Sequence, residues 1–395
     1  MRFRFLGLLA VVVIISIAGS LPKVALSGEV DGKANSSGER PLRLKKVSEG
    51  FIYEEAPFPS CHASTLEQTT DGTLVAAWFG GQHEKADDVG IWVSRLIEGR
   101  WSPPVEVANG VQFQWATPQP VAKSDSTKDG SKLDGTMTNV MRYPTWNPVL
   151  FQVDGGPLLL FYKAGPNPDR WWGMVCESID QGKTWSAGQR LPEGILGPIK
   201  NKPVQLADGT ILCPSSNETP DELDLWTVHF ERYNPKDKSW TKTAPLNDGK
   251  QIGAIQPSIL KLGGDKLLAI GRSRQGKVFQ IASSDNGVTW GEMGLIELPN
   301  PNSGTDAVTL HSGEHVLIYN HVTKKSEEWG GRRSPLNLAI SSDGYHWVSD
   351  LELENEPKKE FSYPAIIQTH DGKIHVTYTW YRERIKHVVL ELLPE

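Results

Sequence analysis

The sequence is poor in the features that mark several large classes of protein. Its 395 residues include only 3 cysteines, Cys61, Cys176 and Cys213. Three cysteines without a Cys-x-x-Cys pair cannot build a disulfide framework, and they lack the spacing of a zinc site, so we expect no metal or other cofactor. The net charge is −6 and no basic block is present, so nucleic acid is not an expected partner.

Long apolar segments are also scarce, with one short exception at the N-terminus. Arg2 and Arg4 precede an apolar run of about 14 residues, Phe5 to Ala18, which is shorter than the roughly 20 residues of a bilayer span. Small residues follow the run, as in a secretory signal. We expect a signal peptide at 1–27, a flexible polar leader at 28–50, and export to the extracellular space or periplasm without stable membrane insertion after cleavage.

After residue 50, alternation of apolar and polar residues replaces helical periodicity. A Gly-containing turn followed by an apolar strand, which is a strong hairpin signal, recurs six times. The copies lie at 70–75, 153–158, 207–212, 263–268, 312–317 and 370–375. Their glycines are 83, 54, 55, 49 and 59 positions apart, a spacing typical of propeller blades. We therefore expect an all-β, six-bladed β-propeller of four-stranded antiparallel blades over 51–395. The long step of 83 positions between the first two glycines is expected to contain an inserted loop at 109–139.

Tryptophan is frequent, with 14 copies, and several of them close a second repeat. Segments 178–185 and 283–290 share the pattern S-x-D-x-G-x-T-W, and 341–347 is a copy shortened by one residue. In such a turn the Asp carboxylate accepts backbone N–H groups, Gly adopts the left-handed conformation, and Trp packs over the hairpin. We interpret these turns as structural staples on the propeller rim.

The S-x-D-x-G-x-T-W turns are Asp-boxes, also called BNR repeats, and with the six hairpins they resemble the sialidase/neuraminidase-like six-bladed propellers over residues 50 to 392. The resemblance implies an exo-sialidase-like glycoside hydrolase. In that family three Arg clamp the sialate carboxylate, a Tyr is the nucleophile, a Glu activates the Tyr, and an Asp on a mobile loop is the acid/base. A neutral Tyr suits this substrate because a carboxylate nucleophile would be repelled by the sugar's own carboxylate.

Three positions match the family's set, and a fourth residue lies beside one of them. Tyr363, in the segment F-S-Y-P before the sixth hairpin, matches the nucleophile. Arg272 matches the second clamp Arg at the end of the fourth hairpin, and Arg274 lies two residues further on the same strand face. Arg333, which stands shortly before an Asp-box, matches the third clamp Arg.

Two positions differ from the family's set. The acid/base is expected on a loop that carries several acidic residues. His62 stands where the first clamp Arg is expected, so it would be a weaker, pH-dependent clamp. Gln256 occupies the position of the activating Glu, although an amide cannot take up the tyrosine proton. The Gly-rich loop of 78–92 carries His83, Glu84, Asp87 and Asp88. Asp88 resembles the family's acid/base best, and Asp87 is the near alternative.

Further residues are expected at the axial mouth, where inner strands of a propeller converge. Arg142 and Trp146 precede the second hairpin, Trp146 as a platform for a sugar ring, and segment 200–202 precedes the third. The leading hypothesis is a secreted, monomeric hydrolase that removes a terminal acidic sugar from a glycan or oligosaccharide. The same pocket would suit a polysaccharide lyase or a uronate-directed hydrolase, or a carbohydrate-binding propeller without catalysis.

Overall fold

The computed structural model describes residues 42–118, 136–220, 225–325 and 328–394. These ranges form strands joined by turns and contain no helix, so none of them provides a helical membrane span. The expected signal peptide at 1–27 and residues 28–41 of the expected leader lie outside the described residues.

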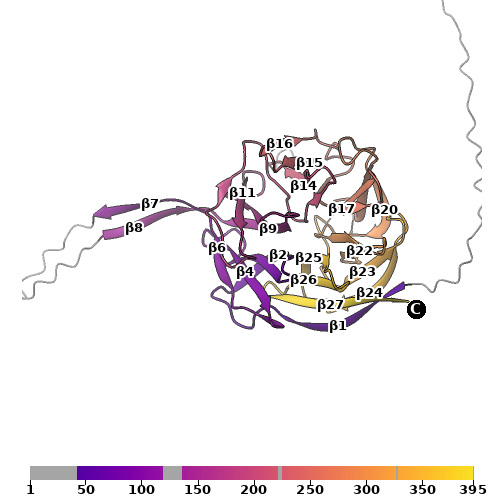
Figure 1. Ribbon diagram of the computed structural model, residues 1–395, viewed down its shortest axis with the longest axis horizontal. Coiled ribbons are helices and arrows are strands. Elements are labelled where there is room, and N and C mark those ends of the chain that lie inside the picture. The colour runs from indigo at the N-terminus through magenta and orange to yellow at the C-terminus, as the bar shows by residue number, and fades with distance from the viewer. Residues whose placement is uncertain (1–41, 119–135, 221–224, 326–327, 395) are drawn as a thin grey trace, which may run out of the picture. The chain divides into compact units, whose positions relative to one another are not determined.

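Six antiparallel sheets surround a common centre (Figure 1), which confirms the six-bladed, all-β propeller. Blade one consists of β2 (Ser60–Gln68), β3 (Leu74–Gly81), β4 (Gly90–Ile97) and β5 (Arg100–Trp101), with β6 (Val105–Ala108) also paired to β4. Blade two consists of β9 (Thr145–Gln152), β10 (Leu158–Ala164), β11 (Trp172–Ser178) and β12 (Gln189–Arg190). Blades three and four are β13 (Val204–Gln205), β14 (Ile211–Glu218), β15 (Trp226–Asn234), β16 (Ser239–Lys242), and β17 (Ala254–Lys261), β18 (Leu267–Ser273), β19 (Lys277–Ser283), β20 (Gly294–Pro299). Blades five and six are β21 (Asp306–Thr309), β22 (His315–Tyr319), β23 (Leu336–Ser341), β24 (Val348–Glu354), and β25 (Phe361–Gln368), β26 (Ile374–Trp380), β27 (Arg384–Pro394), β1 (Leu42–Phe51).

The six predicted turns all join the first and second strands of a blade. Each contains a glycine with positive φ, the conformation that the hairpin turn requires. These glycines are Gly72 (88°), Gly155 (65°), Gly209 (88°), Gly264 (55°), Gly313 (104°) and Gly372 (83°). The hairpin repeat is therefore confirmed as the unit of the ring.

The Asp-boxes join the third and fourth strands of blades two, four and five, and they act as staples. Asp180 accepts the backbone N–H of Thr184 at 2.9 Å, and bonds to that residue lower the pKa of Asp180 to about 2. A Cβ added to Gly287, in the blade-four box, would lie 2.6 Å from Leu212 of blade three. Each box thus fixes its own turn, and the blade-four box also packs on blade three.

The ring is closed by the N-terminal strand. β1 pairs antiparallel with β27 from Leu42 opposite Pro394 to Phe51 opposite Lys386, so it is the outer strand of blade six. Leu44 is buried against this blade, and the pairing covers what would otherwise be an open sheet edge. The propeller therefore includes residues 42–50, which the polar composition had assigned to a leader.

Apolar side chains fill each of the six interfaces between neighbouring blades. One cluster, for example, joins Leu338 of blade five to Phe361 and Val376 of blade six, and five similar clusters complete the circle. The three cysteines are free and buried, as expected for a chain without a disulfide framework. Burial between blades fixes the ring and brings distant segments to its centre.

The expected insertion between blades one and two forms a separate hairpin. Strands β7 (Val111–Pro118) and β8 (Thr136–Arg142) pair with each other and extend away from the ring (Figure 1). The remainder of the predicted loop, 119–135, lies outside the described residues.

Candidate active site

Four inner strands carry a β-bulge, which re-aims a side chain. In β2, β9, β17 and β25 the register with the next strand shifts by one extra residue. The residues with positive φ at these bulges are Ala63 (54°), Asn147 (36°), Gln256 (57°) and Tyr363 (50°). Each such conformation costs about 1–3 kcal/mol and is typical of functional sites. Asn147, Gln256 and Tyr363 each precede a proline, which has no N–H to leave unpaired at the bulge.

The bulges border an axial cavity of about 540 Å³ to which all six blades contribute side chains. Seven of the nine predicted site residues line it: His62, Trp146, Gln256, Arg272, Arg274, Arg333 and Tyr363. The lining has six cations, namely Lys85, Arg170, Arg272, Arg274, Arg333 and Arg382, and three carboxylates, namely Glu84, Asp169 and Glu218. Its formal charge is therefore 6 − 3 = +3, which favours an anionic ligand.

Tyr363, Gln256 and Arg272 form a triangle at the floor of this cavity. Nη1 of Arg272 donates to the Tyr363 hydroxyl at 3.0 Å and to Oε1 of Gln256 at 3.2 Å. Nε2 of Gln256 donates to the same hydroxyl at 3.3 Å. The phenol oxygen therefore receives two N–H donors, an arrangement that orients the hydroxyl and stabilises negative charge on it.

His62 lies under the triangle, but its charge differs from the sequence-based expectation. The imidazole is 2% exposed and its ring centroid is 4.1 Å from that of Tyr363. Burial holds the pKa of His62 well below its usual range, and the nearby Arg382 and Arg333 lower it further. His62 is therefore neutral near neutral pH and cannot be the cationic clamp that its position suggested. Its Nδ1 contacts Oγ1 of Thr379 at 3.0 Å.

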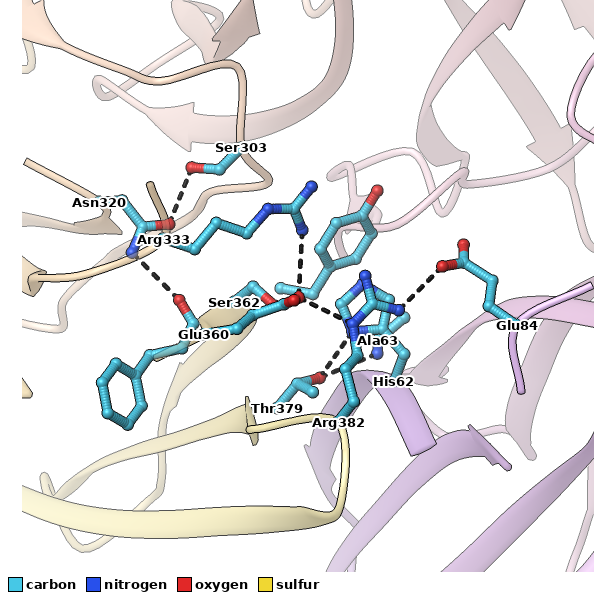
Figure 2. Close-up of polar contacts among 12 residues, drawn as sticks. His62, Ala63, Glu84, Ser303, Asn320, Arg333, Glu360, Ser362, Thr379 and Arg382 are labelled. Atoms are coloured by element: carbon cyan, nitrogen blue, oxygen red, sulfur yellow. Dashed lines mark hydrogen bonds and ion pairs between the residues drawn. The ribbon is translucent and has the colours of Figure 1, made fainter. Parts of the chain in front are cut away.

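Sequence reasoning missed Arg382, which supplies a cation beside His62. Glu360 lies between two guanidiniums (Figure 2), at 2.8 Å from Nε of Arg382 and 3.5 Å from Nη1 of Arg333. Nη1 of Arg382 contacts Glu84 at 2.8 Å from the other side. Arg382 has φ of 66° in the turn between β26 and β27, so the last hairpin aims it at the mouth. A blade-six turn thus provides a cation beside the neutral His62 of blade one.

Arg272 and Arg274 both reach the cavity, as their shared strand face predicted. The guanidinium carbons lie 4.9 Å and 4.2 Å from the ring centroid of Trp226. Arg272 is buried, and its Nε also donates to Asn302 at 3.1 Å. Stacking and hydrogen bonding hold Arg272 in one orientation before any ligand binds.

Asp88 and Arg142 do not line the cavity. The Asp88 carboxylate accepts the backbone N–H of Gln82 at 3.1 Å, and the Asp88 carbonyl accepts Nη2 of Arg142 at 2.6 Å. Asp87 is exposed. The carboxylate that this loop presents to the cavity is Glu84. The predicted loop therefore reaches the cavity through Glu84, whereas the adjacent acidic residues gave no sign in the sequence of which one turns inward.

Glu218 is a second carboxyl group that the sequence did not single out. It ends β14 and lines the cavity, and burial raises its pKa, with Arg272 and Arg274 opposing the rise. The segment 217–219 could be noticed in the sequence only as a glycosylation sequon. Glu218 gives the cavity a carboxyl group that holds its proton to higher pH than an exposed one.

Aromatic rings border the mouth on two sides. Trp146, expected as a sugar platform, is only 3% exposed and packs edge-on against Trp171 at 5.9 Å. Trp329 is 62% exposed and packs edge-on against Trp226 at 5.8 Å. Trp329 therefore offers more open ring surface than Trp146. In the described part of the chain, no group of three or more His, Cys, Asp or Glu is placed to hold a metal ion.

The chain belongs to the BNR repeat-like domain family, which it matches over residues 72–376. It is a divergent member of the sialidase-like Asp-box propellers, since its identity to sialidases of known structure is low. No curated protein matches the chain.

Solved structures share the fold at low identity. A protein of unknown function from Dyadobacter fermentans is 15% identical, with a TM-score of 0.67 over 89% of this chain and 99% of its own. The intramolecular trans-sialidase from Ruminococcus gnavus is 15% identical, with a TM-score of 0.61 over 88% and 97%. The NanB sialidase from Streptococcus pneumoniae is 13% identical, with a TM-score of 0.60 over 87% and 70%.

Proposed function

We propose that this protein is a sialidase-like glycoside hydrolase that removes a terminal acidic sugar from a glycan, with Tyr363 as the nucleophile. The observation that carries the proposal is the 3.0 Å contact between Arg272 and the Tyr363 hydroxyl inside a cationic cavity. A phenol and guanidiniums in one pocket suit a substrate whose carboxylate is attached to the reacting carbon.

Arg272, Arg333 and Arg382 would bind the sugar carboxylate. Nη1 of Arg333 is buried without a hydrogen bond, and its ion pair with Glu360 is long at 3.5 Å. That guanidinium therefore has a donor to offer to an incoming anion. The Glu360 carboxylate lies between Arg333 and Arg382 and offsets the repulsion between their charges.

In the first chemical step the Tyr363 oxygen would bond to the anomeric carbon while the glycosidic C–O bond breaks. The leaving oxygen would take its proton from Glu84, which we assign as the acid/base in place of Asp88. The phenol proton would pass to water, since Gln256 cannot accept it, and the N–H donors of Arg272 and Gln256 would stabilise negative charge on the oxygen as it attacks. Water would then hydrolyse the sugar–Tyr363 bond, with Glu84 accepting the proton of that water.

The direct test is release of acidic monosaccharides from a panel of sialylated and uronic-acid-capped glycans. We expect release by the wild-type protein and roughly 100-fold or greater loss in Tyr363→Phe, since removing a nucleophile leaves only binding and electrostatic effects. Tyr345→Phe, in an Asp-box turn, is the matched control and should retain activity. Binding without release would instead support a carbohydrate-binding propeller.

A polysaccharide lyase is the second candidate, because His62 is kept neutral in contact with Tyr363. A neutral imidazole can abstract the proton beside a uronate carboxylate, while Tyr363 protonates the leaving oxygen and arginines neutralise the carboxylate. Elimination creates a carbon–carbon double bond that absorbs in the ultraviolet, and hydrolysis does not. An absorbance rise on uronate polymers that disappears in His62→Ala would favour the lyase.

We further propose that the protein is exported and acts as a monomer. The N-terminal segment supports export, and the β1–β27 pair closes the ring within one chain, which supports a monomer. Cell fractionation with N-terminal sequencing tests the first point, and light scattering of the mature protein tests the second. A cytoplasmic, uncleaved chain or a stable dimer would contradict them.

A further inference from the structure

Two buried residues before blade three reach beneath the Tyr363–Gln256 pair. Lys200 and Asn201 are 4% and 2% exposed, and neither lines the cavity. Nζ of Lys200 has three acceptors: Oδ1 of Asn201 at 2.8 Å, the Thr305 carbonyl at 3.0 Å, and the Pro364 carbonyl at 2.6 Å. An ammonium has three N–H donors, so this arrangement uses all of them.

These contacts join the two bulges that carry Tyr363 and Gln256. Lys200 bonds the carbonyl of Pro364, which follows Tyr363 in the β25 bulge. Asn201 donates from Nδ2 to the Gln256 carbonyl in the β17 bulge at 2.9 Å. The bond between Lys200 and Asn201 links both contacts, so one dipeptide restrains two backbones that are 107 positions apart.

The same ammonium also lies against the Tyr363 ring. Nζ of Lys200 is 5.8 Å from the ring centroid, and the guanidiniums of Arg333 and Arg272 are 5.7 Å and 6.0 Å from it. Gly304 permits this approach, because an added Cβ would lie 3.2 Å from both Cε of Lys200 and Cδ2 of Tyr363. Lys200 therefore supports the tyrosine by position and by charge.

We propose that Lys200, with Asn201, is a positioning residue that holds the Tyr363 hydroxyl against Gln256 and Arg272, and that this support depends on the protonated state of Lys200. The catalytic part of this inference rests on the proposed function, whereas the positional part does not.

The charge of Lys200 should change near neutral pH. The pKa of Lys200 is lowered to about 7. Burial is the largest cause, Lys202 and Arg272 also lower the pKa, and Asp306 raises it. The other charged or titratable groups near its bonds are Tyr363, Arg333 and His62. Below about pH 7 the ammonium serves all three acceptors. Above that pH a neutral amine has two N–H groups, so one acceptor loses its donor and the positive charge disappears.

The experiment compares Lys200→Met with Lys163→Met. Lys163 is a matched control because it is fully buried, has a pKa lowered to about 7, and does not line the cavity. For an acidic glycan that the wild type cleaves, we expect kcat to decline above about pH 7. Lys200→Met should lose that pH dependence and about 100-fold in kcat, the usual effect of roughly 1 Å misplacement, with KM changed about twofold or less. Lys163→Met should retain the pH dependence.

Crystal structures of both variants provide a readout that needs no substrate. In Lys200→Met the Tyr363 hydroxyl should move beyond hydrogen-bonding range of Gln256, and in Lys163→Met it should stay. Should Lys200→Met fail to fold, Gly304→Ala keeps Lys200 but crowds the ring, and it should displace Tyr363 in the same way. An unmoved hydroxyl with an unchanged pH profile in Lys200→Met, or an unmoved hydroxyl in Gly304→Ala, would overturn the inference. If the wild type shows no turnover but the Tyr363 hydroxyl is still displaced in Lys200→Met, the positioning role stands and only the proposed function is contradicted.

Discussion

The guanidinium of Arg272 lies 3.0 Å from the phenol oxygen of Tyr363, although 91 positions separate them in the chain. Blade four supplies the first residue and blade six the second, so the contact exists only when the ring is closed. The same guanidinium bonds Gln256 and Asn302 and stacks on Trp226. Arg272 is thus fixed between the proposed nucleophile, Tyr363, and the region where we propose that a sugar carboxylate binds.

Arg272→Lys should reduce kcat/KM by roughly 100-fold, or about 2.7 kcal/mol of transition-state binding, because an ammonium cannot bond carboxylate and phenol in the fork geometry of guanidinium. Steady-state kinetics on an acidic glycan measures this loss. Arg190→Lys, in the exposed part of blade two, controls for the substitution itself. Equal activity of the two variants would remove Arg272 from the mechanism.

Gln256→Glu should raise kcat by about 10-fold or more if Tyr363 is a nucleophile, because a positioned base contributes roughly 10²–10⁴-fold. The new carboxylate would lie 3.3 Å from the phenol oxygen and 3.2 Å from Arg272, which would pair with it. That pairing should also raise KM, since Arg272 then has less charge to offer the substrate. A fall in kcat with intact substrate binding would argue that the amide itself is required and would count against Tyr363 as a nucleophile that a base can activate.

Glu84→Gln should lose about 100-fold in activity on natural glycans, whereas Asp88→Asn should lose little. The reason is position: Glu84 lines the cavity, and Asp88 binds the backbone of Gln82. An aryl glycoside with a good leaving group needs little protonation, so Glu84→Gln should recover most activity on it. The opposite ranking of the two variants would restore Asp88 as the acid/base.

Gly287→Ala should destabilise the fold by about 2–3 kcal/mol without altering the site. Gly287 has φ of 73°, and an added Cβ would lie 2.6 Å from Leu212 in blade three. Gly294→Ala is the control, because Gly294 has open space around its Cβ position. Urea denaturation compares the two variants, and similar midpoints would contradict the stapling role of the Asp-box.

Acid should destabilise the protein through the buried pair His375 and His387. Their nitrogens are 3.0 Å apart, and burial lowers the pKa of His375 to about 4 and that of His387 to about 3. The unfolded chain binds these protons first, so stability is lost as pH falls from about 6.5 toward 4, by roughly 2–3 kcal/mol for each imidazole. Thermal melts of His375→Phe should show a shallower acid slope than the wild type and the exposed-site variant His311→Phe. Parallel slopes would exclude this pair as the cause.

Local rules explain how much of the fold the sequence could predict. The Asp-Gly turns and the S-x-D-x-G-x-T-W boxes require particular backbone conformations, so each repeat could be located from a few residues. Strand β1 was missed because an edge strand buries one face, and its exposed lysines and glutamate resemble a polar leader. Its partner β27 lies more than three hundred positions away, beyond the reach of local patterns.

The site was predictable where a residue type stands on a recognisable inner strand, as for Tyr363, Gln256 and Arg272. Arg382 could not be assigned in this way, because its role depends on a turn conformation and on contacts with blades one and six. The choice between Glu84 and Asp88 depends on which way a short loop folds. These features belong to the closed ring and not to any single segment.

The most direct measurement is peptide mass mapping after rapid acid quench during turnover of an acidic glycan. We expect a transient peptide containing Tyr363 whose mass is raised by one acidic sugar residue, and no such species in Tyr363→Phe. Sustained turnover with no adduct on that peptide, above all with an ultraviolet-absorbing unsaturated product, would contradict the role of Tyr363 as nucleophile.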